Sequence, residues 1–303
     1  MKTTFYSNGK LLITGEYLVL DGAKALALPT KFGQNLIVEK SHGKEIKWKS
    51  YDADGSIWFD ETITFSAITS RTPFEIETVK NTLITILRTA YTLNPDTIIN
   101  SDGYIVSTEL TFPRKWGLGT SSTLINNIAQ WFKIDAFTLL KNSFGGSGYD
   151  IACAQNDSPI LYHIEQEKPI VEKVKFNPDF SKNIYFVYLN QKQSSKNAIA
   201  SYKEKKNNLD TQKEAINQIT QLALNALDTN AFAEMLENHE KILSNILETK
   251  TVKEFLFPDF EGTIKSLGAW GGDFVMVVSK KNPLSYFTEK GYETIIMYND
   301  MIL

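Results

Sequence analysis

The sequence of 303 residues contains one cysteine, three histidines and no long uninterrupted apolar run. A lone Cys153 cannot form an intrachain disulfide, and so few histidines make a structural zinc site unexpected. The first apolar run, Leu11 to Leu20, is interrupted by Gly15 and Glu16, so we expect neither a signal peptide nor a membrane span there. These absences favour a cytoplasmic protein.

The sequence also lacks a strong excess of charge of either sign. It carries 32 basic and 35 acidic residues, a formal net charge of −3. Such a balance has no electrostatic footprint for nucleic acid or for an anionic membrane, so we expect neither as a partner. Any anionic ligand must be bound by local groups. The apolar fraction of 42% is that of an ordinary globular protein, and the length favours two domains.

One glycine-containing stretch, Pro113 to Ser122, joins a predicted strand to a predicted helix. Residues alternate in character from Tyr104 to Phe112, and apolar residues then recur at helical spacing from Leu124 to Phe132. Gly117 and Gly119 can adopt positive φ, which lets the backbone approach a ligand, and the next helix offers unpaired N–H groups. The pattern suits a phosphate, although it lacks the Walker A lysine and alone fits an ordinary tight turn equally well.

Other local patterns predict the remaining elements. Antiparallel strands are expected between Glu45 and Phe65, a capped helix start at Thr72, and a long helix capped by Thr229. The polar segment Glu165 to Lys182 is the predicted domain boundary. Asp150 begins a helix after a glycine-rich turn, where capping and a functional role both remain open.

Three glycine clusters occur in order along the chain. The first cluster is Gly9-Lys10 with Gly15-Glu16-Tyr17, the second is Gly117-Leu118-Gly119-Thr120-Ser121-Ser122, and the third is Gly268-Ala269-Trp270-Gly271-Gly272. Together they resemble the three motifs of the GHMP kinases, the kinases for galactose, homoserine, mevalonate and phosphomevalonate. The chain most resembles the phosphomevalonate and mevalonate kinases, through the signature Gly148-Tyr149-Asp150-Ile151-Ala152 and an aspartate, Asp273, after the third cluster.

The resemblance implies a fold, which is an expectation here. It is the α+β, two-domain GHMP kinase fold, with an N-terminal α+β domain containing an unusual βαβ connection and a C-terminal ferredoxin-like α+β domain. The corresponding domains are an ATP-binding domain at 1–170 and the ferredoxin-like domain at 171–303.

The resemblance also implies site residues. The loop that wraps the phosphates of ATP would be Gly117, Leu118, Gly119, Thr120, Ser121 and Ser122, with Ser121 near Mg²⁺. Lys10 and Asp150 would be catalytic and face the phosphoryl acceptor, a small molecule. Residues expected on the substrate side are Ser147, Gly148, Ser195, Lys196, Gly268, Ala269 and Gly271. If Lys10 lacked this context, a solvated lysine at a strand edge would be the simpler interpretation.

Three positions depart from the family pattern. Trp270 replaces a glycine expected in the third cluster, and Thr123 stands where alanine is usual. Leu139 occupies the place of a glutamate that binds metal in mevalonate and galactose kinases. These features favour a kinase acting on 5-phosphomevalonate or mevalonate, with the former ahead. The alternatives are another GHMP-type kinase, diphosphomevalonate decarboxylase, or a non-catalytic ATP-binding protein, and the oligomeric state is open.

Overall fold

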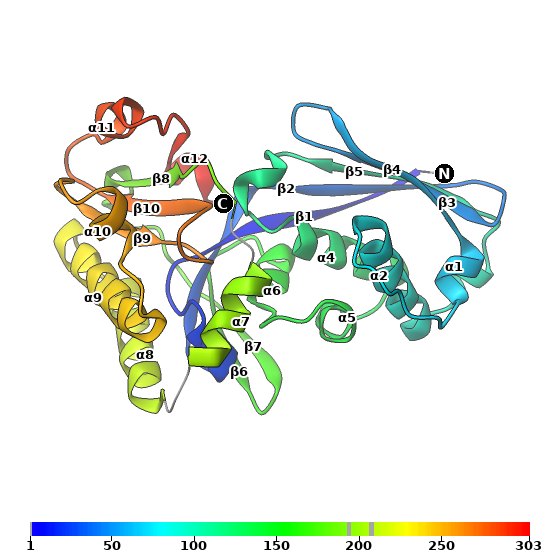
Figure 1. Cartoon of the computed structure of the whole chain (residues 1–303), viewed down its shortest axis with the longest axis horizontal. Coiled ribbons are helices and arrows are strands. Elements are labelled where there is room, and N and C mark those ends of the chain that lie inside the picture. The colour runs from blue at the N-terminus through cyan, green and yellow to red at the C-terminus, as the bar shows by residue number, and fades with distance from the viewer. Residues whose placement is uncertain (1, 193–194, 206–208) are drawn as a thin grey trace. The chain divides into compact units, whose positions relative to one another are not determined.

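The computed structural model describes residues 2–192, 195–205 and 209–303, with the backbone alone at 195, 196 and 205 (Figure 1). Its strands are β1 (Lys2–Leu12), β2 (Ala25–Lys40), β3 (Glu45–Tyr51), β4 (Ile57–Thr64), β5 (Tyr104–Leu110), β6 (Ile160–Glu165), β7 (Lys168–Lys173), β8 (Ile184–Tyr188), β9 (Thr263–Ser266), β10 (Phe274–Val278) and β11 (Ile295–Met297). Its helices are α1 (Phe65–Thr69), α2 (Val79–Leu93), α3 (Asp96–Ile99), α4 (Thr120–Phe132), α5 (Ala136–Ser143), α6 (Tyr149–Gln155), α7 (Ser195–Lys205), α8 (Asp210–Leu224), α9 (Thr229–Leu247), α10 (Val252–Leu256), α11 (Leu284–Glu289) and α12 (Tyr298–Met301).

The chain forms two compact units that alternate along the sequence. The first comprises the segment up to Gly9, Phe32–Arg114 and Leu118–Gln155, and the second comprises Lys10–Lys31, Lys115–Gly117 and Asn156–Leu303. The predicted domains, 1–170 and 171–303, instead divide the chain at a single point. The predicted domains were defined by function, as an ATP-binding and a ferredoxin-like domain, whereas the two units are defined by contacts. The domain assignment therefore stays a prediction.

The first unit is a sheet with helices packed against one face (Figure 1). Strands β4, β3, β5 and β2 are neighbours in that order. β3 and β4 form an antiparallel hairpin, whereas β3 and β5 run parallel and are connected through β4 and the helices α1 to α3. Parallel neighbours require such a crossover. Buried residues of α2, α4 and α5 complete the core, including Leu87, Ile128, Phe132 and Leu139.

The second unit contains a four-stranded antiparallel sheet in the order β11-β8-β10-β9. In order along the chain these are its fourth, first, third and second strands, which is the ferredoxin-like arrangement predicted for the C-terminal domain. The five residues of β10 are all buried, as expected for a central strand. The helices α8 and α9 pack together, and α9 lies against β9.

The structure corrects two helix starts. The predicted start at Thr72 is wrong, because α2 begins at Val79 and is capped by Thr78, whose hydroxyl accepts the Asn81 N–H at 3.1 Å. Ile76, which the predicted apolar stripe included, is 69% exposed, so the buried face cannot begin that early. The cap of α9 is Asp228, with Thr229 as its first helical residue.

The structure also adds two strands. β7 lies inside the polar segment that the sequence favoured as a connection. Nearly all of its side chains are exposed in the hairpin with β6, so the sequence shows no pattern of a buried strand there. The short β9, with the sequence Thr-Ile-Lys-Ser, carries a buried lysine and only one apolar residue, which concealed its strand pattern. Among the helices of the described residues, none is long and apolar enough to cross a membrane.

Candidate active site

The second glycine cluster has the geometry that its sequence predicts. Gly117 and Gly119 have φ of 69° and 100°, and Gly119 is the N-cap of α4. No side chain of the described residues caps this helix, because its N-cap residue is a glycine. The hydroxyl of Ser122 donates back to the Gly119 carbonyl at 2.9 Å. Thr123 Oγ1 lies 2.8 Å from Gln34 Oε1, which ties the first turn to β2. The N-terminus of α4 thus presents main-chain N–H groups beside a glycine loop.

Lys10 and Gly117 meet within the second unit although 107 positions separate them. Lys10 Nζ donates to the Gly117 carbonyl oxygen at 3.1 Å. The bond holds the ammonium group of Lys10, a residue of β1, at the start of the second glycine cluster. It supports a specific role for Lys10, beyond that of a lysine at a strand edge.

The Asp273 carboxyl group lies directly against Gly117. A Cβ built on Gly117, whose φ is positive, would collide with the Asp273 carboxyl group, so a side chain at this point would require the carboxylate to shift. Asp273 has a φ of 52°, and its main chain is held on both sides. Its N–H donates to the Gln191 carbonyl at 2.7 Å, and its carbonyl accepts the Leu189 N–H at 2.8 Å. The carboxylate therefore has a defined place beside the loop.

Aromatic side chains fix the segment that precedes Gly117. Tyr188 Oη donates to the Lys115 carbonyl at 3.1 Å, and the Trp116 ring packs edge-on against Phe274 at 5.4 Å. Burial, and next the negative charge of Asp273, raise the pKa of Tyr188. The phenol stays protonated at neutral pH and can continue to donate.

Asp150 lies in the first turn of α6, in the first unit. Its Oδ1 accepts the Ile151 N–H at 3.0 Å, and the preceding Gly148 has a φ of 90°. α6 packs against α4, the helix of the second glycine cluster. Asp150 and Lys10 belong to different units, so the prediction that they meet at the acceptor stays a prediction.

The third glycine cluster is bonded to the first cluster within the second unit. The Trp270 N–H donates to Tyr17 Oη at 3.1 Å, and Gln191 Nε2 donates to the Gly271 carbonyl. Gly268 and Gly271 have positive φ. The side chains of Ser195 and Lys196, predicted on the substrate side, lie outside the described residues.

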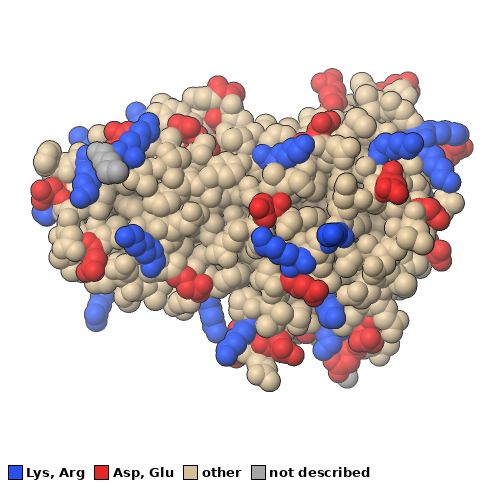
Figure 2. Space-filling view, turned by 180° about the vertical axis from the view of Figure 1, so that it is seen from behind, with Lys and Arg blue, Asp and Glu red and all other residues tan. Residues whose placement is uncertain are grey.

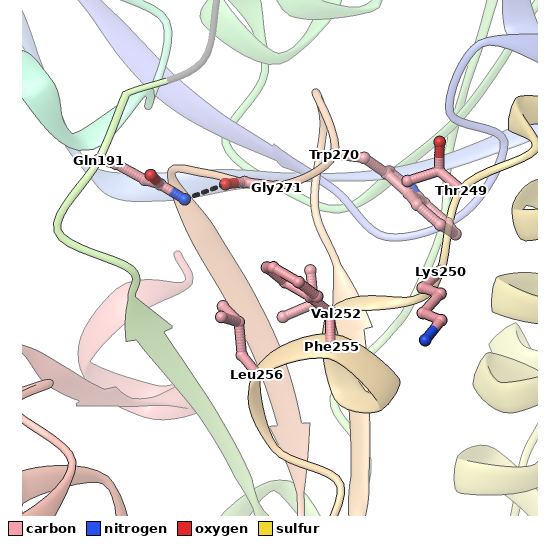
Figure 3. A pocket seen from close by; sticks show the side chains of 8 residues that line it. All are labelled: Gln191, Thr249, Lys250, Val252, Phe255, Leu256, Trp270 and Gly271. Carbon is pink, nitrogen blue, oxygen red and sulfur yellow. Dashed lines mark hydrogen bonds between the residues drawn. The ribbon is translucent and has the colours of Figure 1, made fainter.

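A cavity of about 400 Å³ lies beside the third cluster (Figure 3). The Trp270 ring and the side chains of Val252, Phe255 and Leu256 provide apolar surface, and Gln191 lies across from them. Trp270, one of the three departures from the family pattern, therefore forms part of a pocket wall.

Charge at the surface does not single out a site. On the face drawn in Figure 2, basic and acidic side chains are interspersed. The unusual electrostatics are internal. They belong to a buried cluster of four side chains in the second unit: Glu16, His239, Glu240 and Lys265, each at most 3% exposed.

Lys265 is at the centre of this buried cluster. Its Nζ donates to Glu16 Oε1 at 2.5 Å and lies 3.3 Å from Glu240 Oε1. On the other side of Glu16, its Oε2 is 3.3 Å from His239 Nε2, and that nitrogen accepts the Gly15 N–H at 2.8 Å. The cluster therefore links the first glycine cluster to α9 and β9.

Burial perturbs the ionisation of this cluster. It raises the pKa of Glu16 to about 7, against the opposing charge of Lys265, and it also raises the pKa of Glu240. Burial and, next, the charge of Lys265 hold the pKa of His239 well below its ordinary value. Sequence reasoning missed the cluster; the available signals were a lysine in a buried strand and a His-Glu pair on the apolar side of α9.

Comparison with known proteins bears on the fold. By sequence the chain matches no family model and no curated protein. By structure it resembles the mevalonate kinase of Methanococcus jannaschii, with a TM-score of 0.69 and 15% identity over 98% of each chain. It also resembles Streptococcus pneumoniae phosphomevalonate kinase in complex with phosphomevalonate and AMPPNP (TM-score 0.69, 16% identity, 95% of each chain). A third similar structure is Lactococcus lactis galactokinase with galactose, at a TM-score of 0.67 and 13% identity over 98% of this chain and 92% of that one.

These likenesses span nearly the whole chain and confirm the predicted architecture. The protein has the two-domain α+β fold of the GHMP kinases. At identities of 13 to 16% they establish the fold alone, and activity must be argued from the site.

Proposed function

We propose that the protein is an ATP-dependent kinase of a small molecule, of the phosphomevalonate or mevalonate type. The observation that carries the proposal is the second glycine cluster, where two positive-φ glycines run into the N-terminus of α4 and Lys10 contacts the Gly117 carbonyl. A glycine loop, a helix N-terminus and a cation suit a polyphosphate. The fold supports the same function, since one similar structure holds AMPPNP, an analogue of ATP.

The proposed chemistry asks little covalent work of the protein. Phosphoryl transfer depends on in-line placement and on stabilising negative charge spread over the transferred group. The N–H groups that begin α4 would bind the phosphates. Lys10 would stabilise the charge that develops during transfer, and Asp150 would lie on the acceptor side.

The residues present fit a magnesium ion. Mg²⁺ usually binds to one or two protein oxygens together with substrate phosphates, and needs no cage of carboxylates. Ser121 offers a hydroxyl in the first turn of α4, and Asp273 offers a carboxylate fixed beside Gly117. Either could hold the ion, which when bound would neutralise phosphate charge. A carboxylate next to a phosphate site is otherwise repulsive, and this argues for a cation there.

The acceptor we favour is 5-phosphomevalonate. Leu139 stands where mevalonate and galactose kinases are expected to supply a metal-binding glutamate, and here it is fully buried in the core of the first unit. A phosphate monoester has a second pKa of about 6, so its oxygen is already largely ionised at neutral pH. Asp150 would then orient the substrate and need not act as a base.

The decisive experiment is ADP release from the purified protein with a panel of mevalonate, 5-phosphomevalonate, galactose and homoserine, each with MgATP. We expect 5-phosphomevalonate to give the highest kcat/KM, with a diphosphate product identified by ³¹P NMR. The control is Asp150→Asn combined with Lys10→Met, which separates true turnover from a contaminating ATPase. No substrate-dependent ADP release above that double variant would overturn the proposal.

A separate experiment addresses the metal. Binding of Mn²⁺ in the presence of AMPPNP, followed by electron paramagnetic resonance, should weaken in Ser121→Ala and in Asp273→Asn. Asp54→Asn, an exposed turn carboxylate, is the control and should bind as the wild type does. Unchanged Mn²⁺ affinity in both site variants would remove these residues from the proposed metal site.

A further inference from the structure

The buried cluster around Glu16 has an unbalanced charge. Two carboxylates, Glu16 and Glu240, surround one ammonium group, Lys265, at full burial. If both carboxylates were ionised, the cluster would carry one uncompensated negative charge, which is costly in a protein interior. One proton on a carboxyl group removes that charge.

Geometry identifies the carboxyl group that holds the proton. His239 Nε2 accepts the Gly15 N–H, so the neutral ring carries its own proton on Nδ1. An ionised Glu16 Oε2 would then face Nε2 at 3.3 Å with two acceptors opposed, and Oε2 makes no other hydrogen bond within the described chain. A proton on Oε2 removes this opposition by sharing the Nε2 lone pair with the Gly15 N–H, while Oε1 continues to accept from Lys265. The protonated state is neutral and no longer opposes an ionised carboxylate to Nε2.

The cluster is connected to the third glycine cluster by two short routes. Lys265 lies in β9, three residues before Gly268. On the other side, Glu16 precedes Tyr17, whose hydroxyl accepts the Trp270 N–H at 3.1 Å. Tyr17 has a φ of 63°, a conformation that a side-chain-bearing residue adopts only when its surroundings impose it. A change at Glu16 can therefore act on both partners of this hydrogen bond. It reaches Trp270 through Lys265 and β9, and it reaches Tyr17 directly along the chain.

We propose that the proton held between Glu16 and His239 positions the third glycine cluster, Gly268–Gly272, for the phosphoryl transfer proposed above. With the proton present, Gly15, Glu16 and Tyr17 are held in the conformation that bonds Trp270. Loss of the proton leaves an ionised carboxylate against the acceptor Nε2 and weakens that hold. Glu16 is thus a positioning residue. The inference rests on the proposed function only for its effect on turnover.

The titratable groups that face Glu16 come from three elements. Lys265 comes from β9, His239 and Glu240 come from α9, and Tyr17 belongs to the same turn. The pKa of Tyr17 is raised by burial, so it stays neutral, and the pKa of His239 is lowered. With Glu240 serving as the counter-ion of Lys265, the group left to titrate near neutrality is Glu16, whose pKa is about 7.

The first test needs neither substrate nor nucleotide. The protein is labelled with 5-fluorotryptophan, and the ¹⁹F signal of Trp270 is assigned through Trp270→Phe. From pH 5.5 to 8.5 we expect this signal to move with a midpoint near 7 in the wild-type sequence. A Trp270 signal that does not move over this range would overturn the inference, without reliance on any variant.

Variants then assign the titration. Glu16→Gln keeps a group that can accept from Lys265 and donate to His239 but cannot titrate, so the movement of the Trp270 signal should disappear. Glu261→Gln removes the carboxylate of an exposed pair with Lys281 in the same unit and should leave the movement intact. Movement that survives in Glu16→Gln would overturn the assignment.

The effect on turnover is read separately. With the best substrate of the panel, kcat of the wild-type sequence should fall above pH 7 by about tenfold per pH unit for a single required proton. In Glu16→Gln this fall in kcat above pH 7 should flatten, while the KM for ATP changes less. An identical fall in kcat above pH 7 in both proteins would overturn the proposed effect of Glu16 on turnover. If the ¹⁹F titration is as expected and no substrate is turned over, the positioning stands and the proposed function fails.

Discussion

Lys10 Nζ donates to the main-chain carbonyl of Gly117 at 3.1 Å, which brings the first and second glycine clusters into contact. The bond uses a carbonyl oxygen of the loop and leaves the N–H groups of α4 for an anion. Within the second unit, a cation is thereby fixed at the first glycine of the second cluster. This relationship makes the second cluster more than a tight turn.

Replacement of Lys10 should therefore affect turnover more than nucleotide binding. Lys10→Met keeps the length of the side chain and removes its charge, so we expect kcat to fall roughly 10²- to 10³-fold. The Kd for ATP should change less than roughly tenfold, since the loop N–H groups remain. Lys281→Met, at an exposed surface pair, is the control. A loss of ATP affinity with kcat unchanged would show that Lys10 serves only to bind ATP.

Gly119 should be indispensable for nucleotide binding. Its φ of 100° is unfavourable for any residue with a Cβ, and a valine would also put a branched side chain at the N-terminus of α4. We expect Gly119→Val to abolish measurable ATP binding by calorimetry while circular dichroism reports a retained fold. Gly55→Val is the matched control, because Gly55 also has positive φ but lies in an exposed turn with open space around it. ATP binding that persists in a folded Gly119→Val protein would disprove the loop assignment.

Asp150→Asn distinguishes the possible roles of Asp150. Asparagine caps a helix about as well as aspartate but carries no charge. For the favoured phosphate acceptor, we expect a loss in kcat below roughly tenfold, much smaller than for Lys10→Met. A loss of roughly 10²- to 10⁴-fold would instead identify a general base and an alcohol acceptor. Initial rates over the substrate panel make the comparison.

Local patterns in the sequence were enough to predict the second glycine cluster. Alternation before it, helical spacing after it and two glycines between them are all properties of neighbours in the chain, and β5, both positive φ values and α4 are confirmed. The ferredoxin-like order of β8 to β11 came from the family resemblance, and the structure confirms it. Local spacing could not have predicted which strands pair.

The failures have physical causes. Thr72 with Pro73 is a sound capping pattern, but Ile76 finds no core to pack against, so tertiary burial moves the helix start to Val79. The buried cluster was missed because Glu16 and Lys265 lie 249 positions apart. Burial of such groups depends on the fold, and each alone reads as a surface charge.

The last prediction concerns stability and pH. The pKa of Glu16 is about 7 in the folded chain, above the ordinary 4.5. Between these values the folded chain holds a proton that the unfolded chain has lost, so the contribution of Glu16 to stability falls as pH rises through this window. Glu16→Gln lacks this pH-dependent contribution to stability. The free energy of unfolding of the wild type minus that of Glu16→Gln should thus decline from pH 4.5 to 7, by up to about 3 kcal/mol.

Urea unfolding at intervals of half a pH unit measures this difference. His239 has the opposite sign, because its lowered pKa makes stability fall as pH drops below 6.5. His239 is present in both proteins, and its pKa is lowered by burial and by the charge of Lys265, which the variant keeps, so its contribution largely cancels in the difference. Glu261→Gln should show no such decline, since the pKa of Glu261 is lowered by its bond to Lys281. A difference that stays flat or rises with pH would mean that Glu16 is ionised throughout, and the proton between Glu16 and His239 would then have no thermodynamic support.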